Sequence, residues 1–298
     1  MKPKDERIRL VPGESFRLLQ WTDNLQAVTV LAADGTSTVS AGAGHEWHHH
    51  PQMELTLIEQ GSGTLFIGDA ITPFRAPDLV MIGHDLPHYW HMRQPSAGFA
   101  LQFGFSAEHP FWQFPETAAL RSLWEDARRG VRLYGAAVQN ISGLIREAAV
   151  QGGMGRLALF MRIMAEISTV APRDRPPLAS ATFALPTSQS AYRGLQKAIN
   201  LIFNRFAEDL TFDAVLREAG MSKATFERHF KRHTGRHFTR FLAEVRLNAA
   251  ARQLTDTDLT VSEIALAAGY GNLSYFHRQF RALFGCSPLS FRRKVKPD

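Results

Sequence analysis

Histidine is concentrated in one short part of this chain. Seven of the twelve histidines lie between residues 45 and 91. His48 and His50 are two positions apart, and Glu54 follows four positions later. His88 comes further along, directly after a proline. Two or three imidazoles with one carboxylate suit Zn, Ni, Fe or Mn, so these four residues are candidates for a divalent transition-metal centre.

Short β-strands must position these residues. Residues 15–105 contain short apolar or alternating runs, such as 54–59, 64–67, 79–82 and 99–103, separated by turns. This spacing predicts a sandwich or barrel. His48 and His50 project from one face of an extended segment, and Glu54 shares that face if the strand continues through Pro51. In a small barrel His88 can join them from another strand.

The cluster has three interpretations. The four residues make hydrogen bonds inside the barrel, bind an organic effector directly, or hold a metal that orients or senses a ligand. Trp47 and Trp90 lie close by, and aromatic faces beside polar groups suit a sugar. The predicted effector-binding residues are therefore His48, His50, Glu54, His88, Trp47 and Trp90. The remaining histidines of this stretch are predicted to be exposed or peripheral: His45, His49, His84 and His91.

The net charge of +6 is unevenly distributed. From residue 187 onward there are 18 Lys and Arg against 10 Asp and Glu, a net charge of +8. The preceding residues hold the other 16 basic and 18 acidic residues, a net charge of −2. This pattern is expected when one domain meets a polyanion and the other does not.

The basic third contains an internal repeat. Gly220 and Gly269 are 49 residues apart, and Phe226 and Phe276 are 50 apart, as are Phe230 and Phe280. Each copy predicts a short helix, a turn that contains glycine and a second helix. This is the pattern of a helix-turn-helix unit, whose second helix enters the major groove.

Residues 190–294 resemble the DNA-binding domain of AraC/XylS-type transcription regulators, in which a long helix joins two helix-turn-helix units. The matching segments are Gly220–Ser222, Phe230–Gly235, Arg246–Ala250, Ala268–Tyr270 and Gly285–Pro288. The long helix is expected at about 237–254. One departure is Leu216, where the family usually keeps alanine, as at Ala265 in the second copy. Leu216 could splay the first helix pair slightly.

The resemblance also implies which side chains meet DNA. Base-edge readers are expected at Lys223, Ala224, Glu227 and Arg228 in the first unit and at Leu273, Ser274, His277 and Arg278 in the second. Arg228 and Arg278 can pair bidentately with guanine, and Glu227 can accept from cytosine. Phosphate contacts are expected from Lys231, Arg232, Arg236 and Arg281.

The order Gly42-x5-His48-x-His50-x3-Glu54-x6-Gly61 resembles the first cupin motif. His88 stands where the second cupin motif supplies its histidine. That second motif is incomplete, because Pro77-Asp78 replaces a Pro-x-Gly and no asparagine lies three residues after His88. A cupin-like barrel is the usual effector domain of AraC/XylS-type regulators, so the two resemblances agree.

The expected fold is α+β. A cupin-like β-barrel with appended helices at 116–129, 137–150 and 154–170 occupies residues 1–170, a linker rich in proline and serine occupies 171–190, and an all-α double helix-turn-helix domain occupies 191–298. In the last appended helix one stripe is apolar, and it can pack on the barrel or form a homodimer. Its residues are Leu157, Phe160, Met161, Met164 and Ile167.

The sequence favours a cytoplasmic transcription regulator that is not an enzyme. It has no apolar run long enough to span a membrane and no signal peptide, and its single cysteine, Cys286, cannot form an internal disulfide. The predicted partners are promoter DNA, a small-molecule effector (a carbohydrate by preference), a second copy and, for an activator, RNA polymerase. A metal is not required. The alternatives are a metal-dependent cupin enzyme tethered to DNA, such as a dioxygenase or isomerase, and an architectural DNA-binding protein.

Overall fold

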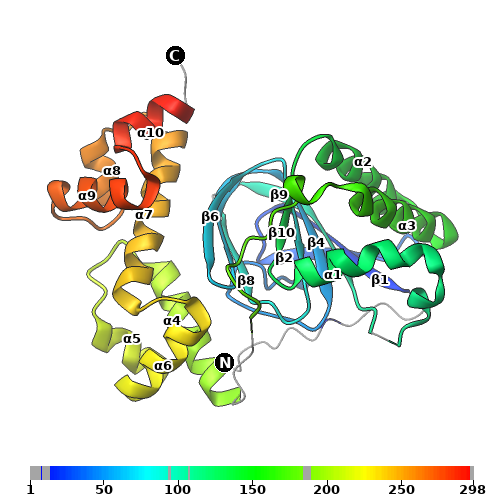
Figure 1. Cartoon of the computed structure of the whole chain (residues 1–298), viewed down its shortest axis with the longest axis horizontal. Helices are drawn as coiled ribbons and strands as arrows, with labels where there is room; N and C mark the ends of the chain where they lie inside the picture. The colour runs from blue at the N-terminus through cyan, green and yellow to red at the C-terminus, as the bar shows by residue number, and fades with distance from the viewer. Residues whose placement is uncertain (1–7, 9–13, 93–94, 107, 184–188, 296–298) are drawn as a thin grey trace. The chain divides into compact units, whose positions relative to one another are not determined.

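The computed structural model describes residues 8, 14–92, 95–106, 108–183 and 189–295, and the chain divides into two compact units. The first unit comprises Met1–Ala70 and Phe74–Phe183, and the second is chiefly Ala184–Asp298. The first is a β-structure with appended helices and the second is helical (Figure 1). The predicted α+β class is therefore confirmed.

Two sheets form the first unit. One has seven strands in the order β10-β7-β4-β9-β1-β2-β3, and the other has three in the order β6-β5-β8. The paired strands run antiparallel, and apolar side chains of both sheets share one core, as in a cupin-like barrel. The strands are β1 (Phe16–Asp23), β2 (Ala27–Leu31), β3 (Ser37–Ala41), β4 (Met53–Gln60), β5 (Ser62–Ile67), β6 (Ala70–Arg75), β7 (Asp78–Ile82), β8 (His88–Met92), β9 (Ser96–Phe103) and β10 (Val131–Leu133).

Strand β4 shows why this sheet is buried on both faces. Met53, Leu55 and Leu57 point to a core shared with the appended helices. Ile58 belongs to the second core, inside the barrel. Because side chains alternate along a strand, Glu54 must point into the barrel. A carboxylate at this buried position needs polar partners.

Three helices pack against the first of these cores: α1 (Leu120–Ala127), α2 (Ala136–Val150) and α3 (Gly153–Thr169). In the predicted apolar stripe of α3, Phe160, Met164 and Ile167 are almost completely buried in this core. Met161 is 39% exposed on the other side of the helix. The stripe thus packs on its own barrel, and the homodimer stays a prediction.

The chain that follows α3 folds back onto the barrel. Pro177 pairs with Val131 of the edge strand β10. The N–H groups of Leu178 and Ala179 donate to the carbonyls of Gly130 and Arg129 at 2.7 and 2.8 Å. The predicted linker at 171–190 therefore includes a segment that belongs to the first unit. An edge strand leaves backbone groups unpaired, and even a proline-rich segment can bind to them. Residues 184–188 lie outside the described part.

The second unit is helical, and its helices are α4 (Gln189–Arg205), α5 (Phe212–Ala219), α6 (Lys223–Thr234), α7 (Phe238–Asp256), α8 (Val261–Ala267), α9 (Leu273–Phe284) and α10 (Pro288–Val295). The turns between α5 and α6 and between α8 and α9 each contain a glycine with positive φ, 61° at Gly220 and 83° at Gly269. These values favour glycine. Helix α7 is the predicted long helix and spans about 28 Å. In the described residues, no helix is long and apolar enough to cross a membrane.

Candidate metal centre and nucleic-acid interface

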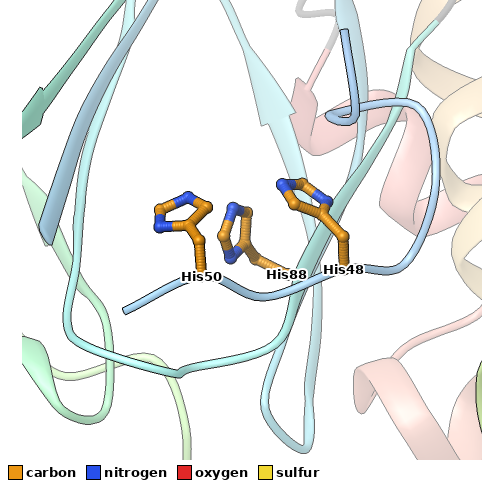
Figure 2. A group of neighbouring side chains, drawn as sticks. All are labelled: His48, His50 and His88. Atoms are coloured by element: carbon orange, nitrogen blue, oxygen red, sulfur yellow. The ribbon is translucent and has the colours of Figure 1, made fainter. Parts of the chain in front are cut away.

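Two segments far apart in the sequence bring three histidines together. The His48 N–H donates to the His88 carbonyl at 3.2 Å, and the His88 N–H donates to the His48 carbonyl at 2.9 Å. The rings of His48 and His88 are 4.2 Å apart, and those of His50 and His88 are 5.1 Å apart. Figure 2 shows the three rings facing a common space. One ring nitrogen of each lies within 4.8 Å of the other two.

Backbone carbonyls fix the orientation of all three rings. The Nδ1 atoms of His48, His50 and His88 each lie 2.8–3.0 Å from a carbonyl oxygen two residues away. A carbonyl only accepts, so each Nδ1 carries the proton. In a neutral ring, as at His48 and His88, Nε2 then keeps its lone pair. The Nε2 of His50 instead donates to the Glu54 carboxylate, and His50 must lose this proton to bind a metal ion. The buried Nε2 of His88 has no hydrogen-bond partner among the described residues. Metal-binding histidines are typically oriented in this way.

Glu54 reaches the cluster by a different route from the one predicted. The strand does not continue through Pro51, and β4 begins only at Met53. Proline cannot donate to a strand ladder, which favours a break at this position. Even so, the Oε2 atom of Glu54 lies 3.1 Å from the Nε2 atom of His50. The structure therefore places Glu54 beside His50, while the group whose ligand atoms all lie within 4.8 Å of one another comprises the three histidines.

A polar ladder across three strands supports Glu54, and the sequence analysis missed it. Glu54 of β4 faces Gln102 of β9, which in turn faces Arg17 of β1. The Gln102 amide donates to Glu54 Oε2 at 2.8 Å and accepts from Arg17 at 3.4 Å. Thr56 donates to the other Glu54 oxygen. The available signal was a lone polar residue, Gln102, inside the apolar run 99–103.

The surroundings set the charges of the cluster. Burial and the neighbouring imidazoles of His88 and His50 hold the pKa of His48 well below its usual value. Burial lowers the pKa of His88 to about 4. Burial alone would raise the pKa of Glu54, but the hydrogen bond from His50 and the nearby His88 hold it below its usual range. At neutral pH His48 and His88 are neutral and Glu54 is ionised, which are the forms that bind metal ions.

The cavity at the cluster is small. It has a volume of about 30 Å³, and its lining includes His48, Glu54 and Trp90. This is room for about one water molecule or one ion. Trp47 is buried and packs edge-on against Phe183, with ring centroids 6.4 Å apart, and it does not line this cavity. Of the two predicted tryptophans, the structure places only Trp90 at the cavity.

The DNA-binding residues were predicted on α6 and α9, and both helices begin at capped ends. The Ser222 hydroxyl accepts from the N–H of Thr225 at 3.4 Å, and the Asn272 side chain accepts from the N–H of Tyr275 at 2.8 Å. Ten predicted residues are exposed, and His277 is partly buried. The exposed residues are Lys223, Ala224, Glu227, Arg228, Lys231, Arg232, Leu273, Ser274, Arg278 and Arg281.

In the first helix-turn-helix, Arg236 differs from expectation and Leu216 differs from its counterpart in the second. Arg236, a predicted phosphate contact, is partly buried, forms an ion pair with Glu244 and donates to the Thr234 carbonyl at 3.0 Å. This ion pair competes with a phosphate for its guanidinium. Leu216 is partly buried, whereas its counterpart Ala265 is 2% exposed. That Leu216 splays this helix pair stays a prediction.

Residues 215–294 match the helix-turn-helix domain family. The chain is 21% identical over 258 residues to the transcriptional activator RhaS of Pectobacterium atrosepticum, which covers 83% of this chain and 88% of that protein. It is 26% identical over 257 residues to RhaS of Salmonella arizonae, with coverages of 83% and 87%. The chain is homologous to AraC-type transcriptional regulators.

Solved structures similar to this chain include the DNA-binding domain of AdpA in complex with a target DNA. That domain is 27% identical, covers 35% of this chain and 97% of its own, and gives a TM-score of 0.34. An AraC-type DNA-binding protein from Chromobacterium violaceum is 28% identical, with coverages of 35% and 95% and a TM-score of 0.33. In this chain α6 and α9 are the second helices of the two helix-turn-helix units.

Proposed function

We propose that this AraC-type regulator activates transcription by binding promoter DNA through α6 and α9, under the control of a ligand of the first unit. The carrying observation is that two copies of one helix-turn-helix unit both present exposed cations on a capped second helix. Activation is inferred from the relatives, which are named transcriptional activators. An activator must also engage RNA polymerase, and two copies on DNA would form the predicted homodimer.

Selection of bound sequences from a random DNA library tests this function. We expect enrichment of a site with two contacted segments about one helical turn, or roughly 34 Å, apart, because α7 links two major-groove helices. The double variant Arg228→Ala/Arg278→Ala should lose the enriched site, while Arg162→Ala, on α3 of the other unit, should keep it. Equal binding to random DNA by all three proteins would overturn the proposal. Transcription from a reporter that carries the enriched site then tests activation.

We further propose that the barrel holds one divalent transition metal ion through Nε2 of His48, His50 and His88 and the carboxylate of Glu54. The supporting observation is the unpartnered, buried Nε2 of His88, which faces two other imidazoles whose orientations are fixed. Such an ion supplies a Lewis acid that can anchor an oxygen or nitrogen donor. The polar ladder from Arg17 through Gln102 holds Glu54 in place for this role.

The volume of the cavity weighs against two other interpretations of the cluster. Pockets for small organic molecules usually measure about 300–1,000 Å³. At about 30 Å³, the space beside His48 and Glu54 is an order of magnitude smaller. A carbohydrate effector, or a substrate of a cupin enzyme, would need this part of the barrel to open. A single metal ion needs no cavity of that size.

Elemental analysis of untagged protein tests the metal site. We expect about one equivalent of Zn, Ni, Fe or Mn in the natural chain and less than a tenth of that in His48→Ala and Glu54→Gln. His237→Ala, an exposed histidine of the other unit, is the matched control and should keep the metal. Substituted Co²⁺ gives an absorption spectrum that reports ligand loss in folded variants. Full metal content in His48→Ala, or no metal in the natural protein after reconstitution, would contradict the proposed metal site.

A further inference from the structure

A second, much larger pocket lies in the first unit beside α1. It has a volume of about 610 Å³, and residues from α1, from the segment after β9 and from the turn before β8 line it. Its volume lies within the usual range for small-molecule sites. Its lining includes Asp85, Phe105, Trp112, Arg121, Trp124 and Glu125.

Aromatic rings form one wall of this pocket and hold one another in place. Phe105 stacks on Phe111 with ring centroids 4.4 Å apart, and Trp112 meets Trp124 edge-on at 5.1 Å. Phe105 and Trp124 are buried, whereas Trp112 is only partly covered. A wall of mutually packed rings is preformed, so a flat apolar ligand can stack on it at a low cost in side-chain entropy.

The lining cation Arg121 lies beside the aromatic wall of this pocket. The Arg121 guanidinium lies 5.0 Å from the centre of the Trp112 ring, and no hydrogen bond or ion pair of Arg121 occurs in the described part of the chain. The two lining carboxylates have partners: Glu125 pairs with Arg128 at 3.2 Å, and Asp85 lies 3.3 Å from His49 Nδ1. Arg121 is thus free to bind a carboxylate with its planar fork.

We propose that this pocket is the effector site of the regulator and that the effector is an aromatic carboxylate. The aromatic side chains stack on the flat ring of the ligand, and the Arg121 guanidinium binds its carboxylate. This inference rests on the proposed function only where it names the ligand an effector; binding itself is independent of DNA. It places the organic ligand outside the barrel cavity, which has about one-twentieth of the volume.

Helix α1 connects this pocket to the chain that leads into the second unit. Asp126, next to the lining residue Glu125, forms an ion pair with Arg175. Arg129, just beyond the helix, donates to the Ala179 carbonyl at 2.8 Å. A ligand that favours one position of α1 therefore also favours one placement of residues 175–179. A preference of this kind is what allows a ligand to change DNA binding.

A backbone hydrogen bond also links this pocket to the proposed metal site. The N–H of Asp85 donates to the carbonyl of His50 at 2.9 Å, and Asp85 has a φ of 55°. Asp85 and its partner His49 thus join the pocket to the segment that carries His48 and His50. The sequence analysis treated His49 and His84 as exposed or peripheral, yet His84 lines the pocket and His49 binds a lining carboxylate.

Calorimetric titration of the full-length protein, without DNA, tests the ligand class. The probe is indole-3-acetate, and indole-3-acetamide is the uncharged control ligand. We expect the acetate to bind at least tenfold more tightly than the amide, and Arg121→Gln to remove most of that difference. Trp112→Leu should weaken both ligands. Arg162→Gln, another exposed arginine of this unit, should change neither.

Promoter binding by the same proteins tests the effector role. Indole-3-acetate should change the affinity for the selected DNA site at least threefold in the natural protein and not in Arg121→Gln. Two results would overturn the inference: no binding of the acetate at millimolar concentration, or binding that Arg121→Gln leaves unchanged. Tight binding without an effect on a functional protein–DNA complex would overturn the effector role. Failure of the proposed function appears separately, as loss of specific DNA binding by the protein without ligand.

Discussion

The two units of this protein present their functional residues in opposite ways. In the barrel, the candidate ligands His48, His50, Glu54 and His88 are at most 5% exposed. In the helical unit, the candidate DNA readers are mostly exposed, and a charge such as that of Arg278 can meet a phosphate or base directly. A buried site selects a small ligand by coordination and shape. An exposed site binds a large polyanion whose own surface completes the interface.

This difference changes what supports each site. In the barrel, Glu54 depends on Gln102 of β9, and His48 and His88 depend on the backbone hydrogen bonds that pair their segments. Each DNA reader depends on its own helix, whose start is capped locally and whose opposite face is anchored by Phe226 and Phe230 or by Phe276 and Phe280. Mutations that perturb contacts between the strands of the barrel should leave the DNA-reading helices intact, and mutations in those helices should leave the barrel intact.

The largest effect is expected from Phe276→Ala. Phe276 is fully buried in the core of the second helix-turn-helix, and removing a buried phenylalanine side chain costs about 3–5 kcal/mol. Hydrogen exchange by mass spectrometry should show lost protection in α8 and α9 and unchanged protection in β4 and β9. Leu266→Ala, at a side chain that is 70% exposed, is the control and should change neither region. Equal loss in both units would show that they do not unfold separately.

Acid should weaken the barrel through its buried histidines. In metal-free protein, burial keeps the pKa of His88 at about 4, below its unfolded value of about 6.5. The contribution of His88 is therefore present above pH 6.5 and is lost as the pH falls toward 4, by on the order of 3 kcal/mol. The contribution of Asp78 to stability has the opposite pH dependence, because burial raises its pKa to about 6.

Urea unfolding of the barrel, followed by exchange protection in β4, isolates this effect. The difference in unfolding free energy between the natural protein and His88→Gln should shrink as the pH falls from 7 to 4, because Asp78 is common to both proteins. The matched substitution in the other unit, His277→Gln, should leave exchange protection in β4 unchanged. A His88→Gln difference that is constant with pH would contradict the assignment of a neutral, buried His88.

Within the helical unit, substitution of a predicted base reader should change DNA binding differently from substitution of a predicted phosphate contact. Arg278→Ala should cost about 1–3 kcal/mol on the selected site and relax specificity at one base position. Lys231→Ala should weaken binding to all sequences alike and reduce the slope of log affinity against log salt by about 1. Fluorescence anisotropy over a salt series measures both. Unchanged binding of Arg278→Ala to the selected site would show that this side chain does not read DNA.

The smallest expected difference lies between the two helix caps. The Asn272 cap bond is 2.8 Å long and the Ser222 bond is 3.4 Å long. Asn272→Ala should therefore cost about 1 kcal/mol of unfolding free energy and Ser222→Ala roughly half of that. Urea unfolding with protection read in α9 and α6 measures both. A larger loss for Ser222→Ala would show that bond length does not rank these caps.

Much of the helical unit follows from local sequence. The repeated glycines, the caps Ser222 and Asn272, and phenylalanines four residues apart specify a turn, a helix start and a buried face within a few residues of one another. The predicted readers lie on exposed faces for the same reason: helical periodicity alone separates the buried side from the exposed side. The ion pair between Arg236 and Glu244 was not predictable in this way, because Arg236 lies in the turn before α7, where helical periodicity does not apply.

In the barrel, part of the candidate site could be predicted from the sequence, and the rest was decided by the tertiary structure. The sequence alone identified His48, His50, Glu54 and His88, because these residue types recur at ligand spacing. Only the fold decided that His88 lies beside His48, that Gln102 and Arg17 support Glu54, and that Trp47 packs away from the cavity. The same holds for the pocket around Arg121 and the placement of residues 175–179. Strand pairing joins residues up to 87 positions apart, as Phe16 of β1 pairs with Phe103 of β9, and no local pattern encodes which strands become neighbours.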